Sequence, residues 1–326
     1  MACPHVEYVE FIQAQPWWAL FPAIIGLLSL LKFSLLLLRW IYVSFLRPGK
    51  PLRRRYGQWA VVTGCTDGIG RAFSFQLARR HGMNLVLVGR NQEKLSQIAE
   101  EIKEKSPKIE TQTVVIDFSG DLVEGVTRLE KVIQGLDVGL LINSAGISYP
   151  YARYFHEVDD ELLKNLIKIN VEGVTRVTHA VLPGMVERKR GAIINIGSGA
   201  ATVIPSDPLY TVYAATKAYI DQFSRCLNVE YKAKGIDVQC QVPLYVATKM
   251  ASVRKSSFLI PSPETYASAG LRHIGYEATC TPYWVHSAIW CVASIIPESA
   301  IDWWRIGFNL KIRKRGQTKD ARKKAE

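Results

Sequence analysis

The feature that most constrains the fold is an alternation of short apolar runs with longer helical patterns. The apolar runs lie at residues 59–63, 84–88, 111–116, 138–143, 192–196 and 237–242, and helical patterns lie at 70–81, 92–105, 122–134 and 160–190. Strands that read as continuous apolar runs are buried on both faces, and parallel strands need a crossover long enough for a helix. The sequence therefore predicts an α/β fold, a doubly wound parallel sheet covered by helices.

Length and composition suit one large domain preceded by a separate N-terminal segment. The chain has 326 residues, of which 48% are hydrophobic, enough for a buried core. We expect a membrane anchor over residues 1–46, a basic linker over 47–57, an α/β domain over 58–310 and a basic tail over 311–326. Within that domain, residues 251–310 are expected to shape a substrate pocket close to the membrane.

The N-terminal segment is predicted to cross a membrane as a transmembrane helix. From Trp17 to Leu38 the chain reads WWALFPAIIGLLSLLKFSLLLL, 22 residues with Lys32 as the single charge. A helix of this length extends about 33 Å, which is enough for the hydrocarbon core of a bilayer. Lys and Arg residues follow the run and none precedes it, so the positive-inside rule places the remaining chain in the cytosol. A cleaved signal peptide is the alternative, although the run lacks a basic n-region.

The net charge of +12 is concentrated in two short segments. Residues 47–55 carry five basic and no acidic side chains, and residues 311–326 carry eight basic and two acidic side chains. Because these segments hold 11 of the 12 net charges, the domain between them is nearly neutral. A basic groove across a folded domain is not expected, so nucleic acid is not a predicted partner.

Two C-terminal features bear on membrane association. The stretch Tyr283–Ile296 is apolar, but it is short for a span and contains His286, so an interfacial or core helix is predicted. Trp303 and Trp304 beyond it suit a membrane interface. The final residues 323–326 read KKAE, which is similar to the dilysine retrieval signal of endoplasmic reticulum membrane proteins; an ordinary basic tail is the alternative.

The cysteines give no indication of a metal site. All six lack a C-x-x-C spacing and an adjacent histidine cluster. Zinc sites and disulfide frameworks need such groupings, so we expect no metal and reduced thiols.

A glycine-rich turn follows the first apolar run. Residues 63–70 read TGCTDGIG and open the first helical pattern, so the glycines stand between a strand and a helix. Glycine lets the backbone approach a pyrophosphate, which free N–H groups at the helix N-terminus bind. This context indicates a dinucleotide site.

Arg90 follows the second apolar run, where an NAD-specific fold carries Asp or Glu for the ribose 2′-hydroxyl. A guanidinium at this position suits a 2′-phosphate, so NADPH is expected in preference to NADH. The alternative is a solvated surface arginine.

Three polar side chains form a candidate catalytic set. Tyr213 and Lys217 are four residues apart and share one face of a predicted helix, and Ser198 follows the run at 192–196. A fixed cation favours the phenolate, so Lys217 is expected to lower the pKa of Tyr213 from about 10 and make it a proton donor near pH 7. A tyrosine and a lysine at this spacing are common in helices in which the lysine is solvated. The catalytic interpretation therefore depends on the glycine turn upstream.

Together these motifs resemble the short-chain dehydrogenase/reductase family. The spacing G-x-x-x-G-x-G over 64–70 is followed by Asn143-Ser144-Ala145-Gly146, Asn170, Ser198, Tyr213-x-x-x-Lys217 and Pro243 with Thr248, and the match covers roughly residues 58–250. The combination of motifs is highly specific.

The resemblance implies a catalytic role for four positions. Tyr213 would donate the proton, and Lys217 would activate it and bind the nicotinamide ribose. Ser198 would orient the substrate carbonyl, and Asn170 would hold a water in the proton relay. From the residues alone, Asn170 is equally well a packed polar side chain.

The resemblance also implies a set of NADPH contacts. They are Gly64, Thr66, Asp67, Gly68, Ile69, Gly70, Arg90, Asp117, Asn143, Ala145, Gly146, Tyr213, Lys217, Val246 and Thr248. Asp117 would contact adenine, and Val246 and Thr248 would contact the carboxamide. Without the resemblance, Asp117 could be a turn former.

The chain departs from the family pattern in three places. Ser144 replaces the usual second asparagine, and Leu244 replaces the glycine after Pro243. The interval between the serine and the tyrosine exceeds the usual one by two residues, so we expect the loop at Pro205–Pro208 to bulge outward. Beyond residue 250 the pattern fades, and a seventh strand is not evident.

The resemblance, the anchor and the C-terminal lysines together imply a membrane-bound enzyme. It would reduce very-long-chain 3-oxoacyl-CoA to 3-hydroxyacyl-CoA with NADPH at the endoplasmic reticulum, facing the cytosol beside other fatty acid elongation enzymes. One alternative is a 17β-hydroxysteroid dehydrogenase, because residues 251–310 do not reveal the substrate by inspection. The other is a non-catalytic scaffold subunit of an elongation complex, against which the retained serine, tyrosine and lysine argue.

Overall fold

The computed structural model describes residues 16–325, with side chains as far as residue 322, and the chain divides into two compact units between Pro48 and Gly49. In the first unit, α2 (Trp17–Ile41) continues into a π-helical turn, η1 (Tyr42–Leu46). The 30 residues of α2 and η1 are long and apolar enough to cross a membrane, the one such helix among the described residues.

The second unit is built on a seven-stranded sheet in which all neighbouring strands are parallel. The strands are β1 (Trp59–Thr63), β2 (Asn84–Gly89), β3 (Thr111–Val115), β4 (Val138–Asn143), β5 (Gly191–Ile196), β6 (Ile236–Gln241) and β7 (Thr279–Cys280). Their order is β3-β2-β1-β4-β5-β6-β7, so the direction of winding reverses between β1 and β4. The predicted doubly wound parallel sheet is therefore confirmed.

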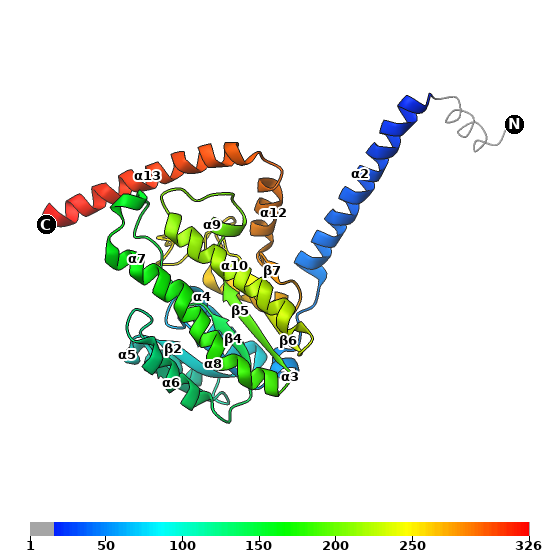
Figure 1. The fold of residues 1–326 in the computed structure, drawn as a ribbon. Coiled ribbons are helices and arrows are strands. Elements are labelled where there is room, and N and C mark those ends of the chain that lie inside the picture. The colour runs from blue at the N-terminus through cyan, green and yellow to red at the C-terminus, as the bar shows by residue number, and fades with distance from the viewer. Residues whose placement is uncertain (1–15, 326) are drawn as a thin grey trace. The chain divides into compact units, whose positions relative to one another are not determined.

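Helices cover both faces of this sheet (Figure 1). Those of the second unit are α3 (Leu52–Tyr56), α4 (Gly68–His81), α5 (Gln92–Lys105), α6 (Leu122–Ile133), α7 (Asp160–Ile167), α8 (Val174–Glu187), α9 (Gly199–Thr202), α10 (Thr211–Lys232), α11 (Pro263–His273), α12 (Trp284–Ala293) and α13 (Glu298–Ala325).

Consecutive strand residues alternate between two cores because they point to opposite faces of the sheet. Leu85 and Leu87 of β2 belong to the core that α4, α5 and α11 complete. Val86 and Val88 belong to the core that α6 and α8 complete. Burial on both faces explains why the strands read as apolar runs without alternation.

Short polar residues set where the helices begin. Asn91 caps α5 by accepting a hydrogen bond from the backbone N–H of Lys94 at 2.8 Å. Asp67 caps α4 by accepting from the N–H of Gly68 at 2.8 Å, so α4 begins two residues before the predicted start.

Two features of the fold differ from the sequence-based expectation. The helical region predicted over 160–190 is interrupted by a π-helical turn, η3 (Lys168–Gly173), between α7 and α8. A seventh strand exists, because β7 pairs with Cys240 and Gln241 of β6. Two residues are too few to give a periodic signal.

The loop at 203–210 is packed beneath α13, which corrects the expected outward bulge at Pro205–Pro208. Asp207 in this loop is 6% exposed, and its carboxylate accepts hydrogen bonds from Arg305 at 2.7 and 3.1 Å. Asn309 donates to the same carboxylate at 2.8 Å and to the carbonyl oxygen of Pro208 at 2.6 Å. As α13 runs to Ala325, it crosses the boundary expected at residue 310.

The second apolar stretch, Tyr283–Ile296, contains the short helix α12. Its inner face is part of the domain, because His286 is fully buried and its Nδ1 accepts a hydrogen bond from the backbone N–H of Leu244 at 3.3 Å. Its outer face is exposed at Ile289 and Val292. Burial lowers the pKa of His286 to about 4, so the imidazole is neutral at pH 7.

Candidate active site

The candidate catalytic residues lie at the carboxyl edge of the sheet, the edge at which doubly wound folds bind their ligands. Ser198 follows β5, and Tyr213 and Lys217 lie one turn apart near the start of α10. The ammonium of Lys217 donates to the carbonyl oxygen of Ile196, the last residue of β5, at 2.8 Å. Ser198 lies close enough to Tyr213 to lower the pKa of its phenol. The structure thus brings the three predicted side chains together.

Burial governs the protonation of this pair. It raises the pKa of Tyr213, and the polar side chain of Ser198 opposes this upward shift only partly. Lys217 Nζ lies 5.9 Å from the centre of the Tyr213 ring, and burial lowers the pKa of Lys217 to about 8. The expectation that Lys217 lowers the tyrosine pKa is therefore wrong for the protein alone. A phenol that keeps its proton at neutral pH is suited to donate it to a carbonyl oxygen.

Asn170 lies in the π-helical turn η3, and its side chain is buried. Its Oδ1 accepts from the N–H of Ile147 at 2.8 Å, and its Nδ2 donates to the Ile147 carbonyl oxygen at 2.9 Å and to Thr216 Oγ1 at 3.1 Å. The side chain therefore joins the loop after β4 to α10, the helix that carries Tyr213. Single π-helical turns are frequent at functional sites because they re-aim side chains.

The glycine turn between β1 and α4 fits a dinucleotide. Gly64 has a φ of 65°, and a Cβ there would lie 2.8 Å from the backbone nitrogen of Ala145, so this position requires glycine. Gly68 also has a positive φ, 54°. Thr66, Asp67, Ile69 and Gly70 form the rest of the turn and the start of α4. The turn leaves the N-terminus of a 14-residue helix at the carboxyl edge of the sheet, where a phosphate is bound favourably.

Arg90 and Asp117 follow β2 and β3 and are both exposed at the same edge. Hydrogen bonds from Ser119 hold the pKa of Asp117 below its usual value, and the charges of Arg90 and Lys168 add to this effect. Asp117 is therefore ionised and within electrostatic range of Arg90. The guanidinium is available to a 2′-phosphate, and the carboxylate can accept from an adenosine group.

The segment after β4 combines a buried network with a close approach to the catalytic residues. Asn143 Nδ2 donates to Asn195 Oδ1 at 2.8 Å and to Thr178 Oγ1 at 3.0 Å, so its side chain holds β4 to β5 and α8. A Cβ at Gly146 would lie 3.1 Å from Asn170 Oδ1 and 3.7 Å from Lys217 Nζ. Thr63 Oγ1 accepts from the N–H groups of Ser144 and Ala145, both at 3.1 Å. The serine that replaces the usual asparagine thus leaves this backbone intact.

The loop after β6 closes over the glycine turn. Lys249 forms an ion pair with Asp67 at 3.0 Å, and a Cβ at Gly68 would lie 3.2 Å from the methyl group of Thr248. Val246 is buried in the core beside it. Leu244, at the position where the family has glycine, contacts Gly199 just after Ser198. Packing of Leu244 therefore defines the course of the loop after β6, which the missing glycine had left uncertain.

Sequence reasoning missed several aromatic side chains around Tyr213. Tyr149 packs on Tyr210 with ring centres 5.4 Å apart, and its hydroxyl accepts from the N–H of Val212 at 3.3 Å. The Tyr245 hydroxyl lies 3.4 Å from Arg305, and Tyr245 and Asp207 both add to the raised pKa of Tyr213. Tyr245 could have been found from the sequence, because it lies two residues after Pro243 in a recognised motif. No local sequence pattern indicated Arg305.

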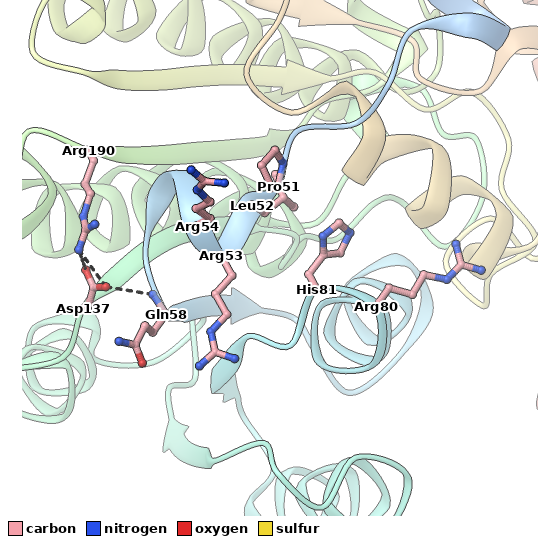
Figure 2. Close-up of a pocket in the computed structure, with 9 residues that line it drawn as sticks. All are labelled: Pro51, Leu52, Arg53, Arg54, Gln58, Arg80, His81, Asp137 and Arg190. Atoms are coloured by element: carbon pink, nitrogen blue, oxygen red, sulfur yellow. Dashed lines mark hydrogen bonds and ion pairs between the residues drawn. The ribbon is translucent and has the colours of Figure 1, made fainter.

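A separate basic pocket of about 570 Å³ lies at the opposite, amino-terminal edge of the sheet (Figure 2). Its lining includes Gln58, Asp137 and Arg190, which immediately precede β1, β4 and β5. Arg190 is paired with Asp137 at 3.0 Å, while Arg53 and Arg54 come from the basic linker. The pocket shares no residue with the candidate site. Among the described residues, no group of three or more His, Cys, Asp or Glu side chains is placed to hold a metal.

The fold and these side chains define a dinucleotide-dependent oxidoreductase. A profile of the short chain dehydrogenase family matches residues 58–257. The chain belongs to this family, as the sequence motifs indicated.

Curated relatives extend over most of the chain. A very-long-chain 3-oxoacyl-CoA reductase-like protein of Arabidopsis thaliana is 47% identical over 92% of this chain and 97% of its own length. The human very-long-chain 3-oxoacyl-CoA reductase is 43% identical over 74% of this chain and 76% of its own length. The human inactive hydroxysteroid dehydrogenase-like protein 1 is 39% identical over 85% of this chain and 84% of its own length.

Solved structures share the fold. A short-chain dehydrogenase from Sphingobium yanoikuyae in complex with NADPH has a TM-score of 0.61 and 27% identity, over 74% of this chain and 96% of that chain. A 7β-hydroxysteroid dehydrogenase has a TM-score of 0.69 and 25% identity, over 78% of this chain and 98% of that chain.

Proposed function

We propose that this protein uses NADPH to reduce very-long-chain 3-oxoacyl-CoA to 3-hydroxyacyl-CoA. The observation that carries the proposal is the meeting of Ser198, Tyr213 and Lys217 beside a glycine turn, in a chain 43–47% identical to relatives named for this activity. The intact serine, tyrosine and lysine also argue against the non-catalytic alternative. That alternative needs testing because one relative, the human hydroxysteroid dehydrogenase-like protein 1, is named as inactive.

The chain's own groups account for carbonyl reduction. NADPH, when bound, supplies a hydride to the carbonyl carbon. The Ser198 hydroxyl orients the carbonyl oxygen, and Tyr213 donates its phenolic proton to that oxygen. The Lys217 ammonium stabilises the phenolate that remains and binds the nicotinamide ribose. Asn170 positions the Tyr213 helix through Thr216 and, in this proposal, also holds a relay water.

The remaining predicted contacts are proposed to hold NADPH. Gly64 to Gly70 and the N-terminus of α4 would bind the pyrophosphate, and Arg90 would bind the 2′-phosphate. Ala145 and Gly146 would line the nicotinamide, with Val246 and Thr248 at the carboxamide. Asn143 would contribute its backbone, since its side chain is used in the sheet.

The membrane context supports a lipid substrate. Each buried methylene contributes about 0.8 kcal/mol, so a very long acyl chain stays in a membrane or on a carrier. We propose that α2 and η1 anchor the enzyme in the endoplasmic reticulum membrane with the catalytic domain in the cytosol, beside other elongation enzymes. The dilysine-like residues Lys323 and Lys324 lie outside the residues whose side chains are described; changing both to Ser should leave the protein membrane-bound but outside the endoplasmic reticulum.

The proposal is tested by NADPH oxidation with the purified full-length protein. A long 3-oxoacyl-CoA is expected to be reduced far more efficiently than a 17-ketosteroid. Tyr213→Phe should lower turnover at least about 100-fold while NADPH binding, followed by nucleotide fluorescence, changes little. Tyr219→Phe is the matched control, because Tyr219 is on the same helix but its hydroxyl pairs with Thr175 at 2.8 Å.

The outcomes separate the rivals. Efficient reduction of the ketosteroid without turnover of the acyl-CoA would establish the hydroxysteroid dehydrogenase alternative. NADPH binding without turnover of either substrate would support the scaffold. Near-normal turnover by Tyr213→Phe would remove the assigned proton donor.

A further inference from the structure

The end of α12 leads into the start of α13 (Figure 1), and the residues around this junction include exposed apolar side chains. We call this surface the α12–α13 corner, and its members are Ile289, Val292, Ile295, Ile296, Trp303 and Trp304. Ile295 is 81% exposed and Trp303 is 79% exposed. Soluble surfaces rarely gather so many large apolar side chains, and when they do the patch marks a binding surface.

The exposed face of α13 changes from aromatic to basic along the helix. At about 3.6 residues per turn, Trp304, Lys311 and Arg315 lie on one face, and Trp303 and Lys314 lie beside them. The opposite face packs on the domain through Arg305 and Asn309. The basic residues on the free side are Lys311, Lys314, Arg315, Lys319 and Arg322, all exposed.

We infer that the α12–α13 corner docks on the surface of a lipid bilayer, with the basic side of α13 over anionic headgroups. Tryptophan favours the boundary between headgroups and acyl chains, and a helix with apolar and basic portions on its free side lies along such a boundary. Covalent connectivity supports a bilayer as the occupant. Residues 47–51 are all that separate η1 from α3, so a short linker tethers the domain to the helix that fits a membrane anchor.

Two side-chain contacts connect the α12–α13 corner to a loop of the candidate active site. On the packed side of α13, Asp302 hydrogen-bonds Ser206, and Arg305 pairs with Asp207. Both partners belong to the loop between Ser198 and Tyr213. One helix diameter, about 10–12 Å, therefore separates the docking face from the loop that shapes the site.

A second exposed apolar segment packs against α12. Phe258 packs edge-on against Trp284 of α12 with ring centres 5.3 Å apart, and Phe258 and Leu259 are exposed. A bilayer held at the corner would place acyl chains beside this segment. Docking thus gives a long acyl chain a direct route from membrane to site, and this delivery step rests on the proposed function.

Docking is tested with the full-length protein in nanodiscs of mixed neutral and anionic lipids, with or without brominated acyl chains. The emission contributed by Trp303 and Trp304 is obtained by comparing the wild type with a Trp303→Phe/Trp304→Phe variant. Brominated lipid should quench that contribution at least about twofold, because bromine quenches only indoles at acyl-chain depth. A contribution insensitive to brominated lipid, as contact with a second copy or another protein would give, overturns the inference.

Delivery is tested by activity in the same nanodiscs with a short, water-soluble 3-oxoacyl-CoA and a long one. Ile295→Ser/Trp303→Ser should lower kcat/KM for the long substrate about tenfold and leave the short one within about twofold, because only the long chain is taken from the membrane. The control Val229→Ser, at a residue of α10 that is also 79% exposed, should change neither. Equal loss with both substrates, or no loss, contradicts delivery. If the wild type reduces neither substrate, the proposed function fails while the quenching result still decides docking.

Discussion

Lys217 holds its charge in a buried position, with its ammonium on the Ile196 carbonyl oxygen. Burial disfavours the charged amine, which is why its pKa falls to about 8. The same burial raises the pKa of Tyr213. At this site burial moves the two pKa values apart, with the lysine shifted downward and the tyrosine upward. The phenol therefore retains the proton that carbonyl reduction requires.

Deprotonation of Lys217 should set the alkaline limb of the pH profile of kcat/KM. The ammonium form predominates below its pKa and is lost above it, so kcat/KM should fall as the pH rises through about 8. Lys217→Arg keeps a cation to much higher pH and should move this limb upward, even if its overall activity is lower. Steady-state profiles between pH 6 and 10 provide the measurement. If the alkaline limb of Lys217→Arg lay at the same pH as in the wild type, the titrating group would be one other than Lys217.

Cofactor choice should depend on Arg90, which is exposed at the end of β2. Arg90→Asp replaces a charge-assisted contact to the 2′-phosphate with repulsion and offers NADH an acceptor for its 2′-hydroxyl. The ratio of kcat/KM for NADPH over NADH should fall at least about tenfold. Arg79→Asp, an exposed arginine near the end of α4, is the control for general charge effects. An unchanged ratio would show that a different residue reads the phosphate.

Helix α13 is the element that completes the loop between Ser198 and Tyr213. The Asp207 and Arg305 side chains are 3% and 9% exposed, and the Asn309 amide donates to the same Asp207 Oδ1 that accepts from Arg305 Nε. Arg313 of the same helix pairs with Glu157. A buried charge pair of this kind is strongly coupled, because removing one member leaves the other desolvated and unpaired.

This coupling predicts a non-additive effect on stability. Asp207→Ala and Arg305→Met should each lower the free energy of unfolding by about 3–5 kcal/mol, and the double variant should lose less than the sum. Denaturant titration of the detergent-solubilised protein provides the measurement. The exposed pair Glu124 and Arg128 is the control, and Glu124→Ala should cost at most about 0.5 kcal/mol. Additive losses at Asp207 and Arg305 would mean that the two side chains act independently.

Whether a feature could be predicted from the sequence depends on how far apart in the chain its interacting residues lie. The strands β1 to β6 have local apolar patterns and were predicted within a few residues, and a helix was predicted at Tyr213 and Lys217 from their spacing. The covering of Asp207 by Arg305 joins residues 98 positions apart and leaves no local pattern. The direction of the Tyr213 pKa was missed for a related reason, since burial depends on the whole fold and residue spacing does not report it.

The whole molecule consists of two units with different demands on their surroundings. The first is an apolar helix, and the second carries its own buried cores and nearly all of the described polar network. The second unit therefore has what it needs to fold without the first, whereas the first has the length and composition for a bilayer.

Removal of the N-terminal helix should change membrane retention more than folding. The full-length protein should resist alkaline extraction, and a form lacking residues 1–46 should be extracted while it keeps NADPH binding. Fractionation followed by nucleotide fluorescence provides both measurements. Alkali-resistant retention of the shortened form would mean that residues 283–296 insert more deeply than a surface contact.

The long separation between Asp207 and Arg305 also has a consequence during protein synthesis. At about 5–20 residues per second, the 98 positions from Asp207 to Arg305 take about 5–20 s to translate. During that interval the N-terminal helix has already been made, but the loop beside Tyr213 lacks the guanidinium that buries its carboxylate. If the N-terminal helix anchors the protein as proposed, a nascent chain is held at the membrane before the loop between Ser198 and Tyr213 is complete. Chains that stop before α13 should then associate with the bilayer without turning over substrate.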